Sequence, residues 1–319
     1  MSVDRRSLLG MAASAAMLPA ARAVAGKGAS TVETIPLWPD VPPGAPAKLP
    51  VEEITFWDQN PVDLNRARKG IARPWLEVFR PIQSIGAAVM VIPGGGYSWV
   101  SIEKEGAEIA EWLNRKGYTA FVLYYRLPGE GWANRENVPL ADAQRGMRLI
   151  RSRAKEFGFD PERIGAMGFS AGGHLTADLA TRFAAKVYDP VDAADALSAR
   201  PRLAAPIYPV VSMAAPYAHA GSRDQLLGPN PSPEMIAAHS PDRNVPADAP
   251  PAFICHAEED FVPTENSVLL WSAWRARKLP AELHLFREGG HGFALRDGAS
   301  ESVVLWTTLF LSFAASVGL

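Results

Sequence analysis

From about residue 75 onward, short apolar runs alternate with longer stretches in which apolar and polar positions mix. Some runs are continuously apolar, such as residues 87–92, which is typical of strands in a parallel sheet covered on both faces. Seven runs predict strands: 75–80, 87–92, 119–124, 163–168, 203–208, 252–256 and 282–286. The stretches between and after them predict helices: 104–116, 140–157, 171–183, 264–277 and 301–315. This alternation indicates an α/β fold, with a central, mostly parallel sheet and helices on both faces.

One region departs from this rhythm, between residues 206 and 251. It contains ten prolines and one short stretch with a helical pattern, 233–238. A long irregular segment inside a compact domain is usually functional. Two interpretations stay open: the segment covers the mouth of an active site, or it is an ordinary surface insertion in a domain that spans residues 75–319.

Residues 26–74 show no comparable alternation. The stretch 38–46 is rich in Pro and Gly. Because each Pro removes a backbone donor and fixes φ, this stretch predicts an extended connector, and residues 26–74 are expected to form an N-terminal arm and linker.

Residues 1–25 have the pattern of an export signal. Arg5 and Arg6 precede a short, weakly apolar run that ends in small residues at Ala23 and Ala25. Paired arginines in this position resemble a twin-arginine leader, which implies a periplasmic or secreted protein. The apolar run is too short to span a bilayer comfortably, so no stable membrane span is expected. An unprocessed N-terminus is the alternative.

Composition narrows the class of protein. The 319 residues are 48% apolar and 21% charged, as in ordinary globular proteins. The formal net charge of −2 gives no long-range attraction to nucleic acid, so no nucleic-acid partner is expected. The single cysteine, Cys255, excludes an intramolecular disulfide, and its place in an apolar run predicts a buried packing residue.

A candidate nucleophile lies between the predicted strand 163–168 and the predicted helix 171–183. The sequence there is Gly168-Phe169-Ser170-Ala171-Gly172. A serine nucleophile needs a sharp strand-to-helix turn that raises its hydroxyl above the sheet, and glycines on both sides leave room for that turn. Since the five-residue pattern alone is a weak signal, its position between strand and helix carries the assignment of Ser170.

A glycine-rich loop, Pro93-Gly94-Gly95-Gly96, follows the strand 87–92 directly. Acyl transfer needs backbone N–H groups where negative charge develops on the substrate oxygen. The expected oxyanion hole is formed by the N–H groups of Gly95, Gly96 and Ala171. A phosphate-binding loop is disfavoured, because no Gly-Lys-Ser/Thr follows and Glu103 and Glu105 would repel phosphate.

His291 is the candidate base among six histidines. It lies in a Gly-rich loop, residues 289–293, after the last predicted strand, which is where a Ser-Asp-His chain order places the base. His174 lies one helical turn after Ser170, and we interpret it as a hydrogen-bonded packing residue.

The candidate acid follows the strand 252–256. Asp260 stands just before Val262-Pro263, where the next helix starts, and would orient His291 and stabilise its protonated form. Glu258 and Glu259 are competitors within two residues, and Asp260 is preferred on position.

These motifs together resemble the α/β-hydrolase esterases with a Gly-Gly-Gly oxyanion loop. The chain is most similar to the bacterial acetyl xylan and feruloyl esterase-like proteins. The resemblance covers about residue 75 to the end and is carried by residues 93–97, 168–174, 251–263 and 289–293. It implies a mostly parallel sheet and the triad Ser170, Asp260 and His291. Pro93 and Phe169 replace the His and Asp of lipase-like relatives, which weakens assignment to that branch. Arg126 and Asp142 match family positions and predict a buried ion pair.

The expected function is therefore serine ester hydrolysis, with an acetylated carbohydrate such as xylan as the expected substrate. Feruloyl or general short-chain esterase activity is the first alternative. A prolyl-oligopeptidase-like peptidase is less favoured, because only a short segment precedes the catalytic domain, and a binding protein with a decayed site is disfavoured by the complete motif set. No cofactor or metal is expected. Tyr97 and Trp99, beside the oxyanion loop, either line an acyl or sugar pocket or pack beneath the loop.

Overall fold

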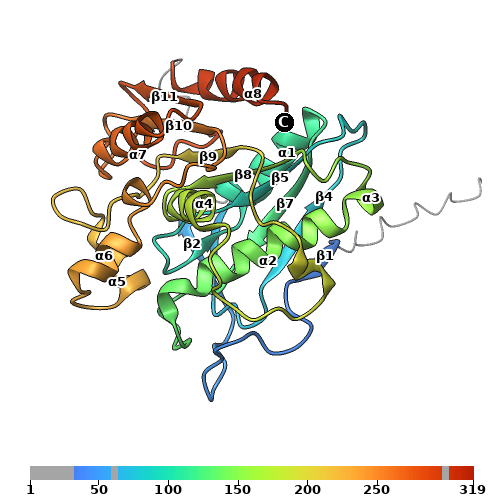
Figure 1. The fold of residues 1–319 in the computed structure, drawn as a ribbon, viewed down its shortest axis with the longest axis vertical. Helices are drawn as coiled ribbons and strands as arrows, with labels where there is room; N and C mark the ends of the chain where they lie inside the picture. Colours follow the sequence, from blue (N-terminus) through green and yellow to red (C-terminus); the bar gives the residue numbers. More distant parts are fainter. Residues whose placement is uncertain (1–31, 59–63, 297–301) are drawn as a thin grey trace, which may run out of the picture. The chain divides into compact units, whose positions relative to one another are not determined.

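The computed structural model describes residues 32–58, 64–296 and 302–319, and its centre is an eight-stranded sheet (Figure 1). The strand order is β1-β4-β7-β5-β8-β9-β10-β11. From β7 to β11 all neighbours are parallel, whereas β4 is antiparallel to β7, and β1 to β4. The strands are β1 (Thr34–Pro36), β4 (Trp75–Phe79), β5 (Ala88–Ile92), β7 (Thr119–Tyr124), β8 (Ile164–Phe169), β9 (Ala204–Ile207), β10 (Ala252–Ala257) and β11 (Ala281–Phe286).

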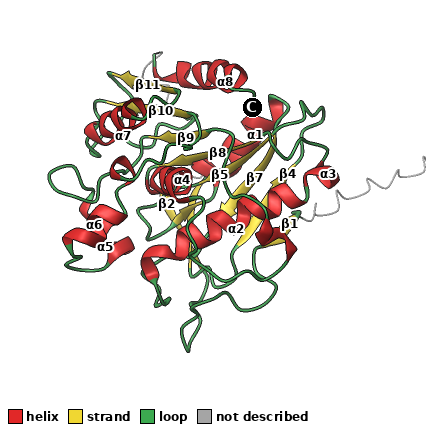
Figure 2. Cartoon of the chain, viewed as in Figure 1, coloured by secondary structure: helices red, strands yellow, loops and turns green. Residues whose placement is uncertain are grey.

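Helices cover both faces of this sheet (Figure 2). The helices that contact the sheet are α1 (Glu108–Arg115), α2 (Val138–Ser152), α4 (Ala171–Arg182), α7 (Glu265–Ala276) and α8 (Trp306–Ser316). The described residues also form α3 (Ala154–Phe157), α5 (Ala220–Leu227) and α6 (Pro233–Ala238). α1 and α8 pack together through the rings of Trp112, Trp306 and Phe310. α4 and α7 share a second apolar cluster that includes Ala177 and Trp274. The predicted α/β fold, with a mostly parallel sheet and helices on both faces, is confirmed.

The segment before residue 75 contains strands that the sequence pattern does not predict. β1 extends the main sheet, and β2 (Glu53–Asp58) and β3 (Asn65–Lys69) form a second, three-stranded antiparallel sheet with β6 (Val100–Ser101). The backbone N–H and guanidinium of Arg66 donate to Glu103, which fastens β3 to a π-helical turn, η1 (Glu103–Ala107). Residues 32–58 and 64–74 thus belong to the folded unit 32–319 and contribute strands to both sheets. The proposed leader, residues 1–25, lies outside the described residues.

The proline-rich stretch that follows β1 packs through a buried charge pair. Arg126 and Asp142 form the predicted ion pair, with side chains 1% and 0% exposed. Trp38 donates its indole N–H to the same carboxylate at 2.8 Å, and Arg126 donates to the carbonyl of Pro43. The stretch therefore satisfies remaining hydrogen-bonding groups of the buried pair and is fixed to the scaffold by these contacts.

The insertion between residues 206 and 251 holds α5, α6 and a short 3₁₀ turn, η4 (Pro241–Arg243). α6 coincides with the predicted helical stretch, but α5 is not predicted, because its sequence AGSRDQLL has no apolar stripe. Cys255 is fully buried, as predicted, and burial raises the pKa of its thiol well above the usual value.

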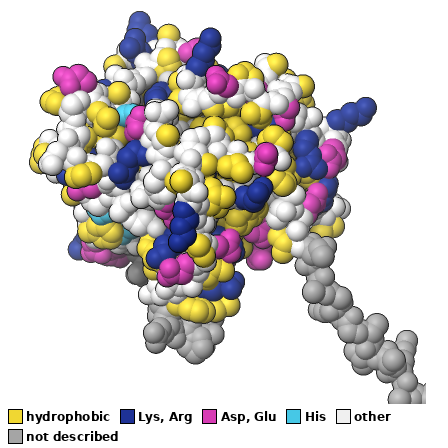
Figure 3. Space-filling model, turned by 90° about the horizontal axis from the view of Figure 1, so that it is seen from below, with side chains coloured by type: hydrophobic (Ala, Val, Ile, Leu, Met, Phe, Trp, Pro, Cys, Tyr) yellow, Lys and Arg dark blue, Asp and Glu magenta, His cyan; other side chains and the backbone are white. Residues whose placement is uncertain are grey.

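Surface charge is mixed on the face drawn in Figure 3, where Lys and Arg side chains lie among Asp and Glu. This distribution agrees with the small net charge. No helix among the residues placed by the structure has the length and apolar character needed to cross a bilayer.

Candidate active site

Ser170 occupies the turn between β8 and α4 in a conformation that serine rarely adopts. Its φ is 52° and its ψ is −118°. A Cβ at Gly168 would collide with the carbonyl of Gly172, and one at Gly172 would collide with the carbonyl of Ile92. Glycine is therefore required at both positions, and the strained turn presents the serine hydroxyl at the carboxyl edge of the sheet.

The structure brings the three predicted catalytic residues into one hydrogen-bonded chain. His291 Nε2 lies 2.8 Å from Ser170 Oγ, and His291 Nδ1 lies 2.7 and 2.8 Å from the two oxygens of Asp260. Asp260 follows β10 and His291 follows β11, so neighbouring parallel strands place their loops at the same edge. A proton can pass between the serine hydroxyl and an imidazole whose orientation the carboxylate holds.

The surroundings of Asp260 favour its ionised form. Burial opposes its charge, but the neighbouring imidazoles of His256 and His291 and the N–H of Val262 outweigh that cost, so its pKa lies below the ordinary value. His256 Nε2 approaches Asp260 Oδ2 at 3.2 Å, although the alignment falls short of a hydrogen bond. The competing Glu258 and Glu259 are exposed to solvent. The geometry therefore selects Asp260, as the sequence predicts.

The backbone donors expected for an oxyanion hole surround Ser170. Gly95 and Gly96 have φ values of 131° and 63°, and both line the cavity that contains Ser170. Ala171 begins α4 directly after the serine. Within the described residues, the N–H groups of Gly95, Gly96 and Ala171 have no acceptor, so they are available to a substrate oxygen.

Glu105 is a site residue that sequence reasoning does not identify. It is buried, accepts the N–H of Gly94 at 2.8 Å, and accepts the hydroxyl of Tyr208 at 3.0 Å. Burial raises its pKa above the ordinary value of 4.5. The Glu105 carboxylate thus links the oxyanion loop to Tyr208, whose ring centroid lies 5.2 Å from that of His291. A sequence signal exists: Glu105 precedes the buried Ile109 by one helical turn, an acid on an apolar stripe.

Tyr97 and Trp99 do not line the cavity, so of the two alternatives left open by the sequence the structure favours packing around the loop over a substrate-binding role. Tyr97 has a positive φ of 59° and is 1% exposed. Its hydroxyl oxygen lies 2.7 Å from His174 Nδ1. His174 Nε2 lies 2.9 Å from the carbonyl of His239, so His174 is a packing residue, as predicted. Trp99 packs beneath Lys69 instead, with Nζ 4.5 Å from its ring centroid.

The cavity beside Ser170 has a volume of about 320 Å³. We call its reactive base the floor: Gly95, Gly96, Glu105, Ser170 and His291. We call its outer side chains the rim: Trp57, Asn65, His219 and Phe261. The rim comes from the second sheet, from the 206–251 insertion and from the loop after β10. The insertion therefore contributes a wall of the cavity.

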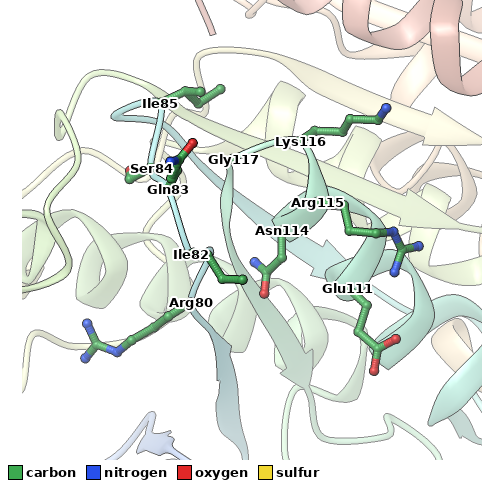
Figure 4. Close-up of a pocket in the computed structure, with 10 residues that line it drawn as sticks. All are labelled: Arg80, Ile82, Gln83, Ser84, Ile85, Glu111, Asn114, Arg115, Lys116 and Gly117. Carbon is green, nitrogen blue, oxygen red and sulfur yellow. The ribbon is translucent and has the colours of Figure 1, made fainter.

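A wider cavity of about 730 Å³ lies at the amino ends of the parallel strands, opposite the carboxyl ends where Ser170 lies (Figure 4). Its walls are residues 80–85, which lead into β5, and residues 114–117, which lead into β7. The charged ends of Arg80, Arg115 and Lys116 point in different directions in Figure 4 and do not converge. Active sites of open α/β sheets lie at the carboxyl ends of strands, so the smaller cavity is the candidate site.

A metal site in residues 32–58, 64–296 and 302–319 would need a cluster of side chains that could bind the ion. No three His, Cys, Asp or Glu side chains there come together as a metal site requires.

Two curated relatives resemble this chain over about two thirds of its length. An acetylxylan esterase of Xylanibacter ruminicola is 34% identical over 220 residues, which are 67% of this chain and 42% of that protein. Endo-1,4-beta-xylanase B of Butyrivibrio fibrisolvens is 36% identical over 210 residues, which are 66% of this chain and 33% of that protein. The chain thus spans less than half the length of these relatives.

Solved structures show the fold. The acetyl ester-xyloside bifunctional hydrolase from Caldicellulosiruptor lactoaceticus has a TM-score of 0.72 and 34% identity, covering 90% of this chain and 96% of that one. MGS-M1, an alpha/beta hydrolase from a Medee basin deep-sea metagenome library, has a TM-score of 0.58 and 24% identity, covering 84% and 98%. The predicted α/β-hydrolase fold is confirmed. The sequence profile of the BD-FAE family matches residues 76–274, well over half of the chain, which therefore belongs to the BD-FAE family.

Proposed function

We propose that the protein is a serine carboxylic ester hydrolase that removes acetyl groups from acetylated carbohydrate such as xylan. The observation that carries the hydrolase assignment is the 2.8 Å contact between Ser170 Oγ and His291 Nε2 in an open cavity beside free backbone donors. The carbohydrate assignment is supported by the similarity to an acetylxylan esterase and to an acetyl ester-xyloside hydrolase.

In the first half-reaction, Ser170 Oγ attacks the ester carbonyl and His291 Nε2 takes its proton. The carbonyl oxygen becomes negative and accepts from the N–H groups of Gly95, Gly96 and Ala171. When the tetrahedral intermediate collapses, the bond to the alcohol oxygen breaks and His291 protonates that oxygen. The alcohol leaves, and the acyl group remains as an ester on Ser170.

In the second half-reaction, water attacks the acyl-enzyme while His291 takes a proton from it. Collapse breaks the bond to Ser170 Oγ, His291 returns the proton, and the carboxylic acid departs. Asp260 stays ionised throughout and stabilises the imidazolium of His291 in both steps, which agrees with its lowered pKa.

The size and polarity of the cavity favour a short acyl group. About 320 Å³ must hold both the acyl group and part of the alcohol. Each methylene that finds no apolar wall forgoes about 0.8 kcal/mol of burial. The proline-rich insertion beside the cavity has no sustained apolar face of the kind that a lipase needs for a long chain. Acetyl esters are therefore the expected best substrates.

The test compares kcat/KM for acetyl, butyryl and octanoyl aryl esters and then measures acetate released from acetylated xylan. We expect a fall of about tenfold per one or two added carbons, and acetate release from xylan. Octanoyl as the best substrate, with no acetate from xylan, would contradict the proposal. Faster release of ferulate than of acetate would favour the feruloyl alternative instead.

Export is a further part of the proposal and rests on the pattern of residues 1–25. We expect the protein recovered from a bacterial periplasm to begin near residue 26. N-terminal sequencing checks this, and an intact Met1 or Ser2 there would refute cleavage.

A further inference from the structure

His219 has a fixed tautomer. It is the N-cap residue of α5, and its Nδ1 accepts the backbone N–H of Ser222 at 3.3 Å. The hydroxyl of Ser222, a fully buried residue, lies 2.8 Å from the same nitrogen. Since a nitrogen that accepts an N–H carries no proton of its own, the ring proton of neutral His219 lies on Nε2. Burial, aided by the nearby His291 and opposed by Asp260, lowers the pKa of His219 and so favours the neutral ring.

The Nε2–H of His219 is an unused donor at the cavity. His219 lines the same cavity as Ser170 and His291. Its Nδ1 is engaged by Ser222 at the start of α5, which leaves Nε2, on the other side of Cε1, as the second ring nitrogen. Nothing within the described part of the chain accepts a hydrogen bond from this Nε2. A donor placed in this way is available to a ligand in the cavity.

Phe261 stands between this donor and the base. Its ring lies 4.4 Å from the ring of His291 and 5.8 Å from that of His219, and the residue is 68% exposed. A solvent-exposed ring at a cavity mouth offers an apolar face for a ligand. Because His291 must deliver its proton to the leaving alcohol, the alcohol part of the ester lies on the side of His291. Phe261 and His219 therefore flank the alcohol.

We propose that His219 and Phe261 form the subsite for the alcohol of the ester, and that this alcohol is a sugar ring with a free hydroxyl beside the esterified one. The apolar face of the ring packs on Phe261, and the free hydroxyl oxygen accepts from His219 Nε2–H. This inference rests on the proposed acetyl esterase function. His219 is then a specificity-determining residue, because it recognises a hydroxyl of the alcohol. The residues of the floor contact only the ester group.

The test is a cycle of two substrates and two enzymes. The substrates are a monoacetylated methyl xyloside and the same ester with the neighbouring hydroxyl replaced by hydrogen. The variant is His219→Asn, because Asn is a good N-cap acceptor for Ser222 N–H but is too short to place a donor in the cavity. The wild type should prefer the hydroxylated ester by about tenfold in kcat/KM, and His219→Asn should lose that preference.

Two controls separate the outcomes. His284→Gln removes a histidine of β11 that does not line the cavity, and it should keep the tenfold preference. His219→Ser, with another N-cap side chain, replaces His219→Asn if that variant does not fold. A variant that retains the preference overturns the inference, as does a wild type that hydrolyses both sugar esters equally. A wild type that hydrolyses aryl acetate and neither sugar ester overturns the carbohydrate proposal itself.

Discussion

The floor and the rim of the cavity differ in how their side chains are held. On the floor, Ser170 and His291 are joined by a hydrogen bond, and Glu105 accepts two more from buried groups. On the rim, Phe261 is 68% exposed, and His219 keeps one donor without an acceptor in the described residues. A preorganised floor lowers the barrier for any ester that reaches it. Discrimination between esters is left to the rim.

The two regions also have different origins in the fold. The floor is assembled mainly at the carboxyl ends of parallel strands, after β5, β8 and β11. Such turns are held by the sheet, which supports the sub-ångström placement that catalysis needs. The rim comes from β2 and β3 of the second sheet, from the 206–251 insertion and, for Phe261, from the loop after β10. Loops of this kind change shape and chemistry at little cost to the scaffold.

The largest expected effect is on the floor, from Ser170→Ala. The change removes one hydroxyl and closes the covalent route, so kcat should fall by roughly 10⁴-fold or more. Thermal unfolding should be nearly unchanged, because the serine side chain contributes little packing. A variant that keeps a tenth of the wild-type kcat would remove Ser170 from the mechanism.

The next largest loss of activity is expected for Asp260→Asn, because Asp260 holds His291 of the floor. The amide keeps the shape but offers the wrong hydrogen-bonding pattern to His291 Nδ1, so kcat should fall by roughly 10³–10⁴-fold. Glu258→Gln and Glu259→Gln are matched controls, since both side chains are exposed. Greater damage from either control would show that the acid is misassigned.

The difference between floor and rim also explains what the sequence predicts. Strands β5, β7, β8 and β10 are buried at every position and stand out as continuous apolar runs. The pattern does not predict β1, which has three residues, or β3, whose positions are mostly half-buried. Period-based reasoning needs a consistently buried face over several residues. Neither β1, at the edge of the main sheet, nor β3, in the middle of the small sheet, has one.

Within the site, local chemistry decides what is predictable. Ser170, Asp260 and His291 each follow a strand in a short turn, so their motif and position can be read together. His219 and Phe261 share no motif and meet only in the folded chain. The sequence leaves two roles open for Tyr97, because no pattern reveals that the positive φ of its turn directs the side chain to a buried partner.

A smaller effect is expected where the floor is held in place, at Glu105. Glu105→Ala leaves the N–H of Gly94 and the hydroxyl of Tyr208 without their acceptor, at about 1–3 kcal/mol each. The displaced loop should reduce kcat by roughly 10–100-fold. Glu105→Gln can accept from Gly94 and donate to Tyr208, so it should recover most of kcat. Equal losses in both variants would contradict a positioning role.

The wild type and Glu105→Gln also give a test of the pH dependence of stability. Burial raises the pKa of Glu105 above 4.5, so the folded state binds this proton more tightly than the unfolded chain. The ionised carboxylate therefore destabilises the fold fully above the raised pKa, and the penalty disappears below pH 4.5. The Tm of Glu105→Gln relative to wild type should rise from pH 4 to pH 7. A difference in Tm that is constant with pH would refute the raised pKa.

The smallest effect is expected at the rim, from Phe261→Ala. The exposed ring contributes little to the core, so the Tm should stay within a few degrees of wild type. Loss of an aromatic contact with a sugar ring should raise KM for a monoacetylated xyloside by roughly three- to tenfold, with a smaller change in kcat. Phe56→Ala is the matched control, because Phe56 is also exposed but lies outside the cavity lining. A fall in kcat of more than a hundredfold, with KM unchanged, would place Phe261 with the floor, since a substrate-binding ring acts on ground-state affinity first.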